Sequence, residues 1–74
     1  MRLGVHVFVD EREAADALLA EGFLPIGHDR TQHYRHPNRD ADRWVQRADV
    51  HVRPGAKGGR DTAQAQVRVW RAFA

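Results

Sequence analysis

The sequence contains no cysteine and no serine, and its only threonines are Thr31 and Thr62. Disulfides, thiolate–metal sites and covalent catalysis by a serine or cysteine nucleophile are therefore excluded. No apolar stretch approaches the ~20 residues of a membrane-spanning helix. The N-terminal residues also lack the unbroken apolar segment of a signal peptide. We therefore expect a soluble cytoplasmic protein with no membrane contact and no cofactor.

Lysine is almost absent, because eleven of the twelve basic residues are arginine and Lys57 is the exception. The charge is also uneven along the chain. Residues 1–29 carry two arginines against six carboxylates, whereas residues 30–74 carry ten basic side chains against four carboxylates. Guanidinium groups pair with phosphates and carboxylates and stack on flat rings. The asymmetry predicts two faces with different electrostatic roles, although codon usage that favours arginine over lysine explains the composition equally well.

Seventy-four residues form one domain with a small core. Apolar side chains alternate near the N-terminus, which predicts a strand over residues 2–9. Pro25 makes residues 23–26 an edge strand or an irregular extended segment, and residues 54–62 contain three glycines and predict a hairpin connection. Three further strands are predicted by composition and alternation at residues 31–36, 43–53 and 63–73.

A helix is predicted between the first two extended segments. Asp10 is a favourable N-cap and Glu13 completes a capping box, so the helix should cover residues 11–21. Gly22 stands where a left-handed C-cap is favoured, and Phe23 can supply the accompanying hydrophobic contact. The expected fold is a single small α+β domain in the order β-α-β-β-β, with one helix on one face of an antiparallel sheet. The apolar stripe of the helix consists of Ala14, Ala15, Leu18 and Leu19.

Alternation along the strands predicts which side chains share each face of the sheet. The expected inner face, under the helix, holds Leu3, Val5, Val7, Val9, Tyr34, Trp44, Val50, Val52, Val67 and Val69. The expected outer face holds Thr31, His33, Arg35, Arg47, Asp49, His51, Arg53, Gln64, Gln66, Arg68 and Trp70. One helix cannot cover both faces, so the outer face must be solvated or must meet a partner.

The candidate binding residues combine this outer face with the glycine-rich hairpin tip. Lys57 and Arg60 in the tip could hold a phosphate backbone, although the loop lacks the spacing of a phosphate-binding loop and no helix follows it. Trp70 is a candidate contact residue, or else folds over the sheet edge as part of the core. The full set is His33, Arg35, Arg47, His51, Arg53, Lys57, Arg60, Arg68 and Trp70.

The five histidines suggest two further kinds of chemistry. Acid–base attack on RNA would use His33, His36 or His51 near a 2′-hydroxyl group. A metal site would use His28, His33 and His36 with Asp29, but the H-x4-H-x2-H spacing is not a standard zinc pattern. On a strand, His33 and His36 also point to opposite faces. We therefore expect no metal.

Two short stretches, LLAEGF and HYRHP, together resemble the helix–strand passage of HicA-type ribonuclease toxins over about twenty residues. The resemblance implies a Gly-Ser-His motif that supplies a catalytic histidine. In this chain Asp29, Arg30 and Thr31 occupy those positions, so that histidine is absent. The chain also is expected to begin and end with a strand, where that family ends in a helix, which indicates shared packing rather than kinship.

These observations support three functional hypotheses. The leading one is a non-enzymatic recognition module whose basic face and hairpin tip bind nucleic acid or a nucleic-acid-handling protein such as a nuclease. The alternative is a phage-type or mobile-element-type inhibitor, comparable to anti-CRISPR proteins, that blocks a host enzyme by protein–protein contact. The third is a histidine-based ribonuclease. Homodimerisation through an open sheet edge also remains possible. In the inhibitor hypothesis an acidic helix surface could mimic phosphate, through Glu11, Glu13, Asp16 and Glu21.

Overall fold

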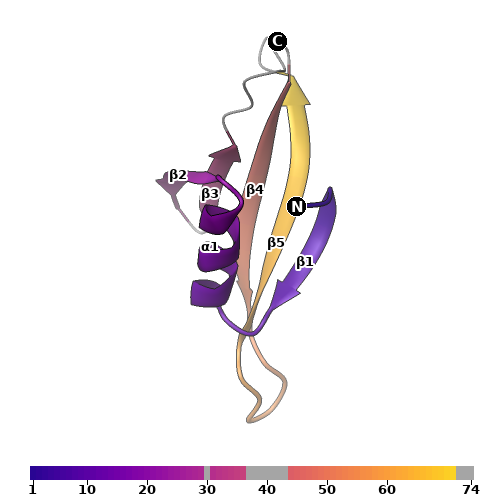
Figure 1. The fold of residues 1–74 in the computed structure, drawn as a ribbon. Coiled ribbons are helices and arrows are strands. Elements are labelled where there is room, and N and C mark those ends of the chain that lie inside the picture. The colour runs from indigo at the N-terminus through magenta and orange to yellow at the C-terminus, as the bar shows by residue number, and fades with distance from the viewer. Residues whose placement is uncertain (30, 37–43, 72–74) are drawn as a thin grey trace.

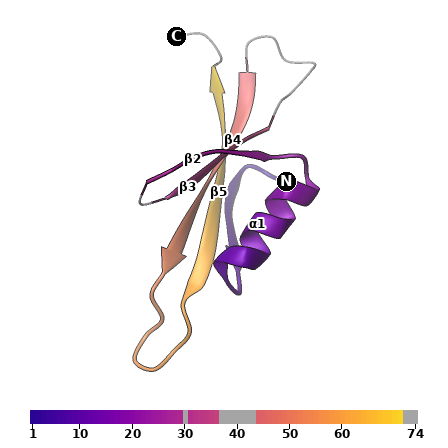
Figure 2. The ribbon, with the colours of Figure 1, turned by 90° about the vertical axis from the view of Figure 1, so that its left-hand side faces the viewer.

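The computed structural model describes residues 1–29, 31–36 and 44–71, without the side chains of residues 44, 45, 70 and 71. Its single antiparallel sheet has the strand order β1-β5-β4-β3-β2, and α1 lies on one face of it (Figures 1 and 2). Within the described ranges, no helix is long and apolar enough to cross a membrane. The elements are β1 (Gly4–Phe8), α1 (Glu11–Ala20), β2 (Leu24–His28), β3 (Gln32–His36), β4 (Trp44–Arg53) and β5 (Thr62–Arg71).

The expected α+β class with one helix on an antiparallel sheet is confirmed. The segment that Pro25 marked as an edge strand or an irregular segment is a complete edge strand, β2, which pairs with β3. The order is therefore β-α-β-β-β-β, with one strand more than the order expected from the sequence. A register shift between Pro25 and Gly27 accommodates the proline, which has no N–H to donate to a neighbouring strand.

The N-terminus of α1 follows the predicted capping pattern. Asp10 Oδ1 accepts a hydrogen bond of 2.8 Å from the Glu13 N–H. Glu13 Oε2 in turn accepts one of 2.7 Å from the N–H of Val9, one residue before the cap. The two side chains therefore satisfy one backbone donor inside the helix and one just outside it.

The C-terminus of α1 is a Schellman motif. Gly22 has φ +98°, a left-handed conformation that glycine adopts without steric cost. Its N–H donates to Leu19 O at 3.0 Å, and the Phe23 N–H donates to Leu18 O at 3.0 Å. The side chains of Phe23 and Leu18 are both fully buried, so the hydrophobic contact that completes this motif forms part of the core.

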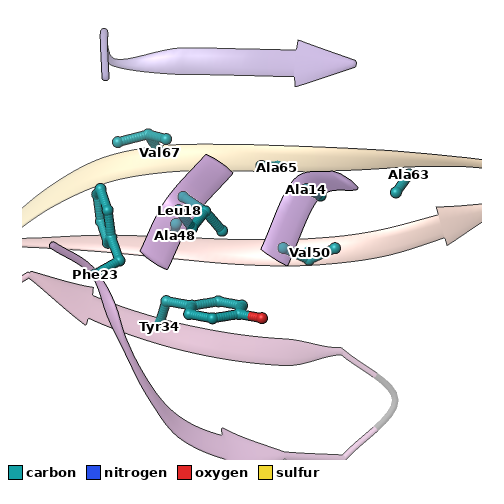
Figure 3. Close-up of a cluster of buried hydrophobic side chains, with 9 residues drawn as sticks. All are labelled: Ala14, Leu18, Phe23, Tyr34, Ala48, Val50, Ala63, Ala65 and Val67. Atoms are coloured by element: carbon teal, nitrogen blue, oxygen red, sulfur yellow. The ribbon is translucent and has the colours of Figure 1, made fainter. Parts of the chain in front are cut away.

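The core lies between α1 and the facing side of the sheet (Figure 3). Phe23, Leu18 and Val67 are its largest fully buried side chains. Four of its nine members are alanines, which lets the helix backbone approach the strands closely. The buried cluster consists of Ala14, Leu18, Phe23, Tyr34, Ala48, Val50, Ala63, Ala65 and Val67.

The predicted inner face of β1 is wrong. Gly4, His6 and Phe8 pair with Val67, Ala65 and Ala63 of β5, and cross-strand partners point to the same face. Because those β5 residues are buried under α1, Phe8 packs against the core and the alternate residues of β1 point away from the helix. The physical reason is size: Phe8, the largest side chain of β1, stands on the helix side of the sheet in register with the small Ala63. The residues expected inside are 57–65% exposed and are Leu3, Val5, Val7 and Val9.

Three other expected core residues are also exposed, namely Leu19, Val52 and Val69. A ten-residue helix is about 15 Å long, whereas ten-residue strands such as β4 and β5 reach about 33 Å. The β4–β5 ribbon therefore extends beyond the helix at both ends (Figure 1). Val52 stands one residue before the end of β4, and Val69 stands two residues before the end of β5. Leu19 lies on the flank of α1 beside the buried Leu18. Trp44 is also expected in the core from the sequence, but its side chain lies outside the part of the chain that the structure describes.

Candidate functional site

The sheet face opposite α1 carries a row of three arginines. Strand pairing sets Arg35 of β3 opposite Arg47 of β4, and Arg47 opposite Arg68 of β5. Neighbouring strands lie about 4.8 Å apart, so the three side chains leave the sheet close together. Like charges directly opposite one another on a sheet are destabilising. We call Arg35, Arg47 and Arg68 the arginine row.

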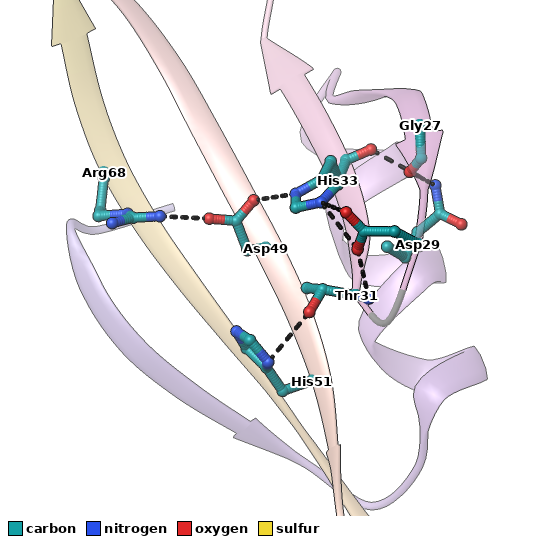
Figure 4. Close-up of polar contacts among 8 residues, drawn as sticks. Gly27, Asp29, Thr31, His33, Asp49, His51 and Arg68 are labelled. Carbon is teal, nitrogen blue, oxygen red and sulfur yellow. Dashed lines mark hydrogen bonds and ion pairs between the residues drawn. The ribbon is translucent and has the colours of Figure 1, made fainter.

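The next row of the same face is built around Asp49, which is 5% exposed although it points away from the helix. Its Oδ1 is 2.6 Å from His33 Nδ1 and its Oδ2 is 2.5 Å from Arg68 Nη2. Figure 4 shows the carboxylate between these two side chains, which come from the strands on either side of it. Asp49 therefore neutralises part of the charge of the face while its neighbours shield it from solvent.

The pKa values of Asp49 and His33 shift in opposite directions. Burial by itself raises the pKa of the Asp49 carboxyl, but the hydrogen bonds from His33 and Arg68 outweigh it, and the pKa lies below its ordinary value of 3.8. The hydrogen bond to Asp49 is the largest cause that raises the pKa of His33 above 6.5, and a further one to Asp29 acts in the same direction. The pair is therefore stabilised as a carboxylate and an imidazolium.

Both ring nitrogens of His33 face carboxylates, since Nε2 lies 3.3 Å from Asp29 Oδ1. An imidazole can donate from both nitrogens only when it is protonated. With neither nitrogen directed at a substrate position, this geometry gives no support to His33 as an acid or base for RNA cleavage. Asp29 Oδ1 also accepts a 2.9 Å hydrogen bond from the Thr31 N–H, which fixes the turn that carries the carboxylate.

His36 lies on the helix side of the sheet, opposite to the face that carries His33, as the alternation predicted. Its Nε2 lies 2.9 Å from Glu21 O, and its ring meets that of Phe23 edge-on with centroids 5.1 Å apart. Among the residues that the structure describes, no group of three or more metal-ligating side chains could hold a metal ion. His36 thus closes the end of the core beside the C-terminus of α1.

A shallow hollow lies further along the same face, toward the hairpin. His51 Nδ1 is 3.2 Å from Thr31 Oγ1, and the Arg53 Nε–H donates to Gln64 Oε1 at 3.3 Å. The hollow has a volume of about 440 Å³ and combines cationic, amide and apolar groups. Its lining consists of Val5, His51, Val52, Arg53, Pro54, Gln64 and Gln66.

The hairpin tip continues this surface beyond the ends of β4 and β5. Lys57 and Arg60 are exposed there. Two contacts shape the loop: the Gly59 N–H donates to Ala56 O at 2.6 Å, and the Gly55 N–H donates to Asp61 Oδ1 at 3.1 Å. The tip is therefore a turned loop that presents two cations.

Strand pairing brings most of the predicted binding residues onto one face. His33, Arg35 and Arg47 come from β3 and β4 and stand near Arg68, whereas His51 and Arg53 lie toward the tip. The side chain of Trp70 lies outside the described part. Asp29 and Asp49 were not among the predicted site residues. The available signal was the alternation of β4, which places Asp49 between two outward basic positions.

No family model matches the chain, and comparisons with curated proteins and with solved structures also gave no match.

Proposed function

We propose that the sheet face opposite α1 binds the phosphate backbone of single-stranded nucleic acid. The observation that carries this proposal is the arginine row across three neighbouring strands. Such a cluster costs stability unless it meets anions, because like charges repel one another. Asp49 offsets part of the charge, but it is enclosed by His33 and Arg68 and presents no open carboxylate to a ligand.

The distribution of acidic groups supports the same conclusion. Glu11, Glu13 and Asp16 are exposed on α1, and Glu21 is exposed at its C-terminus, so these carboxylates belong to the helix side of the molecule. On the opposite face the four arginines of the strands outnumber the carboxylates of Asp49 and the exposed Asp29, so an anionic polymer that approaches it should meet a positive potential. The hollow beside Arg53 adds the amides of Gln64 and Gln66, which can hydrogen-bond to base edges that a single strand leaves unpaired.

The alternative of an acidic helix that mimics phosphate has less support in the described contacts. The Glu13 carboxylate accepts the Val9 N–H at 2.7 Å, and the Glu21 carboxylate lies 2.6 Å from the N-terminal ammonium of Met1. That contact is the first cause that lowers the pKa of Glu21. Two of the four carboxylates are thus engaged within the chain, which leaves Glu11 and Asp16 to act as a mimic.

Fluorescence anisotropy with labelled single-stranded RNA and DNA, measured over a range of salt concentrations, tests the proposal. The logarithm of affinity should fall linearly with the logarithm of salt concentration, by about 0.7 per neutralised phosphate. The double variant Arg35→Gln/Arg53→Gln should lower this slope by about 1.4. The matched control Arg2→Gln/Arg12→Gln removes the same charge from exposed positions outside the face.

Two results would refute the proposal. One is the absence of binding to either probe at low salt. The other is an equal loss of affinity in the control variant, because that would show a response to net charge rather than to this face. If neither probe binds, the next experiments are inhibition assays of nucleic-acid-handling enzymes, with the acidic surface of α1 as the expected contact surface.

A further inference from the structure

The two edges of the sheet differ in how they are protected from pairing with another strand. A free edge exposes unpaired N–H and C=O groups and invites strand addition unless proline, a bulge or a charge blocks it. The β2 edge has two such features, Pro25 and the register shift beside it. The β1 edge pairs with β5 in unbroken register from Gly4 to Phe8 and contains no proline, lysine, arginine or carboxylate.

The outer face of β1 is apolar as well as unprotected. Val5 and Val7 are 57% and 65% exposed and stand beside Gln66 and Gln64 of β5. Leu3 and Val9, which flank the strand, are 58% and 61% exposed. Four adjacent aliphatic side chains on an edge strand form the kind of exposed apolar patch that marks an interaction site.

The pattern of β1 is symmetric about His6. Reversing the strand exchanges Val5 with Val7, and Gly4 with Phe8. An antiparallel pair of two copies centred on His6 would therefore set valine opposite valine on the outer face. On the helix side it would set glycine opposite phenylalanine, and a Cβ built on Gly4 meets no atom within 4 Å, so a neighbouring phenyl ring has room there.

We propose that β1 pairs with β1 of a second copy of this chain around a two-fold axis at His6, which joins two five-stranded sheets into one. An interface of this kind uses the same patch on both subunits, so that patch must be complementary to itself. A fixed charge beside the axis would face its own copy. The absence of arginine, lysine and carboxylates from β1 meets this requirement, which a strand that binds a different protein does not need to meet.

The pairing is short, and a standard stable interface buries about 1,200–2,000 Å². The dimer should therefore dissociate on dilution, and its formation does not depend on nucleic acid. The arginine row lies on β3, β4 and β5, and a two-fold axis perpendicular to the sheet keeps the same face of both copies on one side, so both arginine rows would remain open on the same face of the joined sheet.

Sedimentation velocity between about 10 μM and about 1 mM protein tests this pairing, a range that spans weak association constants. The weight-average mass of the unaltered chain should rise from 8.5 kDa toward twice that value. The Val7→Lys variant places a charge beside the axis and should remain at 8.5 kDa throughout. The matched control is Leu24→Lys, an exposed aliphatic residue on the protected β2 edge, which should associate as the unaltered chain does.

Amide hydrogen exchange gives a readout that does not need a variant. The β1 amides that do not bond to β5 should gain protection as protein concentration rises, while those of β2 should not. A mass that stays at 8.5 kDa at every concentration would overturn the proposal. So would association that Leu24→Lys abolishes and Val7→Lys leaves intact.

Discussion

Replacing Asp49 with asparagine tests the polar network on the uncovered face. The change is nearly isosteric, but it removes the charge that His33 and Arg68 share. A hydrogen bond to a charged group contributes about 1.5–3 kcal/mol. His33 and Arg68 keep 27% and 45% of their side-chain surface exposed, so water replaces part of the loss, and the asparagine oxygen can still accept from one of them. We therefore expect unfolding free energy to fall by about 2 kcal/mol.

That loss is large for a domain of this size. With stability of about 0.05–0.15 kcal/mol per residue, 74 residues provide only about 4–11 kcal/mol. One kcal/mol corresponds to about 4–8 °C for domains of 60–100 residues, so Tm should fall by about 8–16 °C. Thermal unfolding followed by circular dichroism measures the change. Asp16→Asn is the matched control, because it removes the same charge from an exposed position on α1 and should shift Tm by less than about 4 °C.

The same variant separates stability from binding. Without Asp49 the face carries one more net positive charge, so binding to a single-stranded probe should strengthen at low salt while the fold weakens. Equal Tm values for Asp49→Asn and the unaltered chain would refute the reasoning, because Asp49 would then contribute no more than a surface carboxylate. Weaker binding by a variant that is folded at the assay temperature would refute its electrostatic part.

Two further predictions concern pH and the core. His33, whose pKa is raised in the folded state, contributes its full stabilisation below pH 6.5 and loses it as pH rises through the folded-state pKa. Asp49, whose pKa is lowered in the folded state, contributes its full stabilisation above pH 3.8 and loses it as pH falls through the folded-state pKa. Tm should therefore be highest between about pH 4 and 6.5, and its decline at higher pH should be shallower in His33→Gln; identical pH profiles would contradict this. Phe23→Ala should destabilise by about 3–5 kcal/mol, because the side chain is fully buried between α1 and the sheet. Urea denaturation should show the transition midpoint of that variant at a much lower urea concentration, whereas Leu19→Ala, at a half-exposed position, should change little.

The helix could be predicted from the sequence because its signals are local. Asp10 and Glu13 are three residues apart, and Gly22 and Phe23 follow the last turn directly. Each signal acts through backbone groups within one turn, so no distant partner is needed to choose between conformations. The outward positions of β4 were also predictable, because basic and polar residues alternate there with buried Ala48 and Val50.

The Asp49 network could not be predicted in the same way. Asp49 contacts a histidine 16 residues away and an arginine 19 residues away, and both contacts depend on the register of β4 with its two neighbours. A shift of one residue in either pairing would move Asp49 away from its partners. The sequence predicts a charged face, but its internal neutralisation appears only when three strands are aligned.

Alternation along the first strand predicts the wrong inward face for a related reason. Counting apolar residues favours Leu3, Val5, Val7 and Val9 as the buried set, yet in the structure Phe8 packs partly buried against the core and all four aliphatic residues are exposed. Full burial of an aliphatic side chain supplies about 1.5–3 kcal/mol, and each of these side chains, 57–65% exposed, forgoes more than half of it. A solvated outer face would be served as well by threonine or glutamine, as β5 shows with Gln64 and Gln66 on the same face. Pairing of two β1 strands would set the valines of one copy beside those of the other and bury part of this surface, so the alternation that misleads a prediction for one chain is the alternation expected when two chains meet at β1.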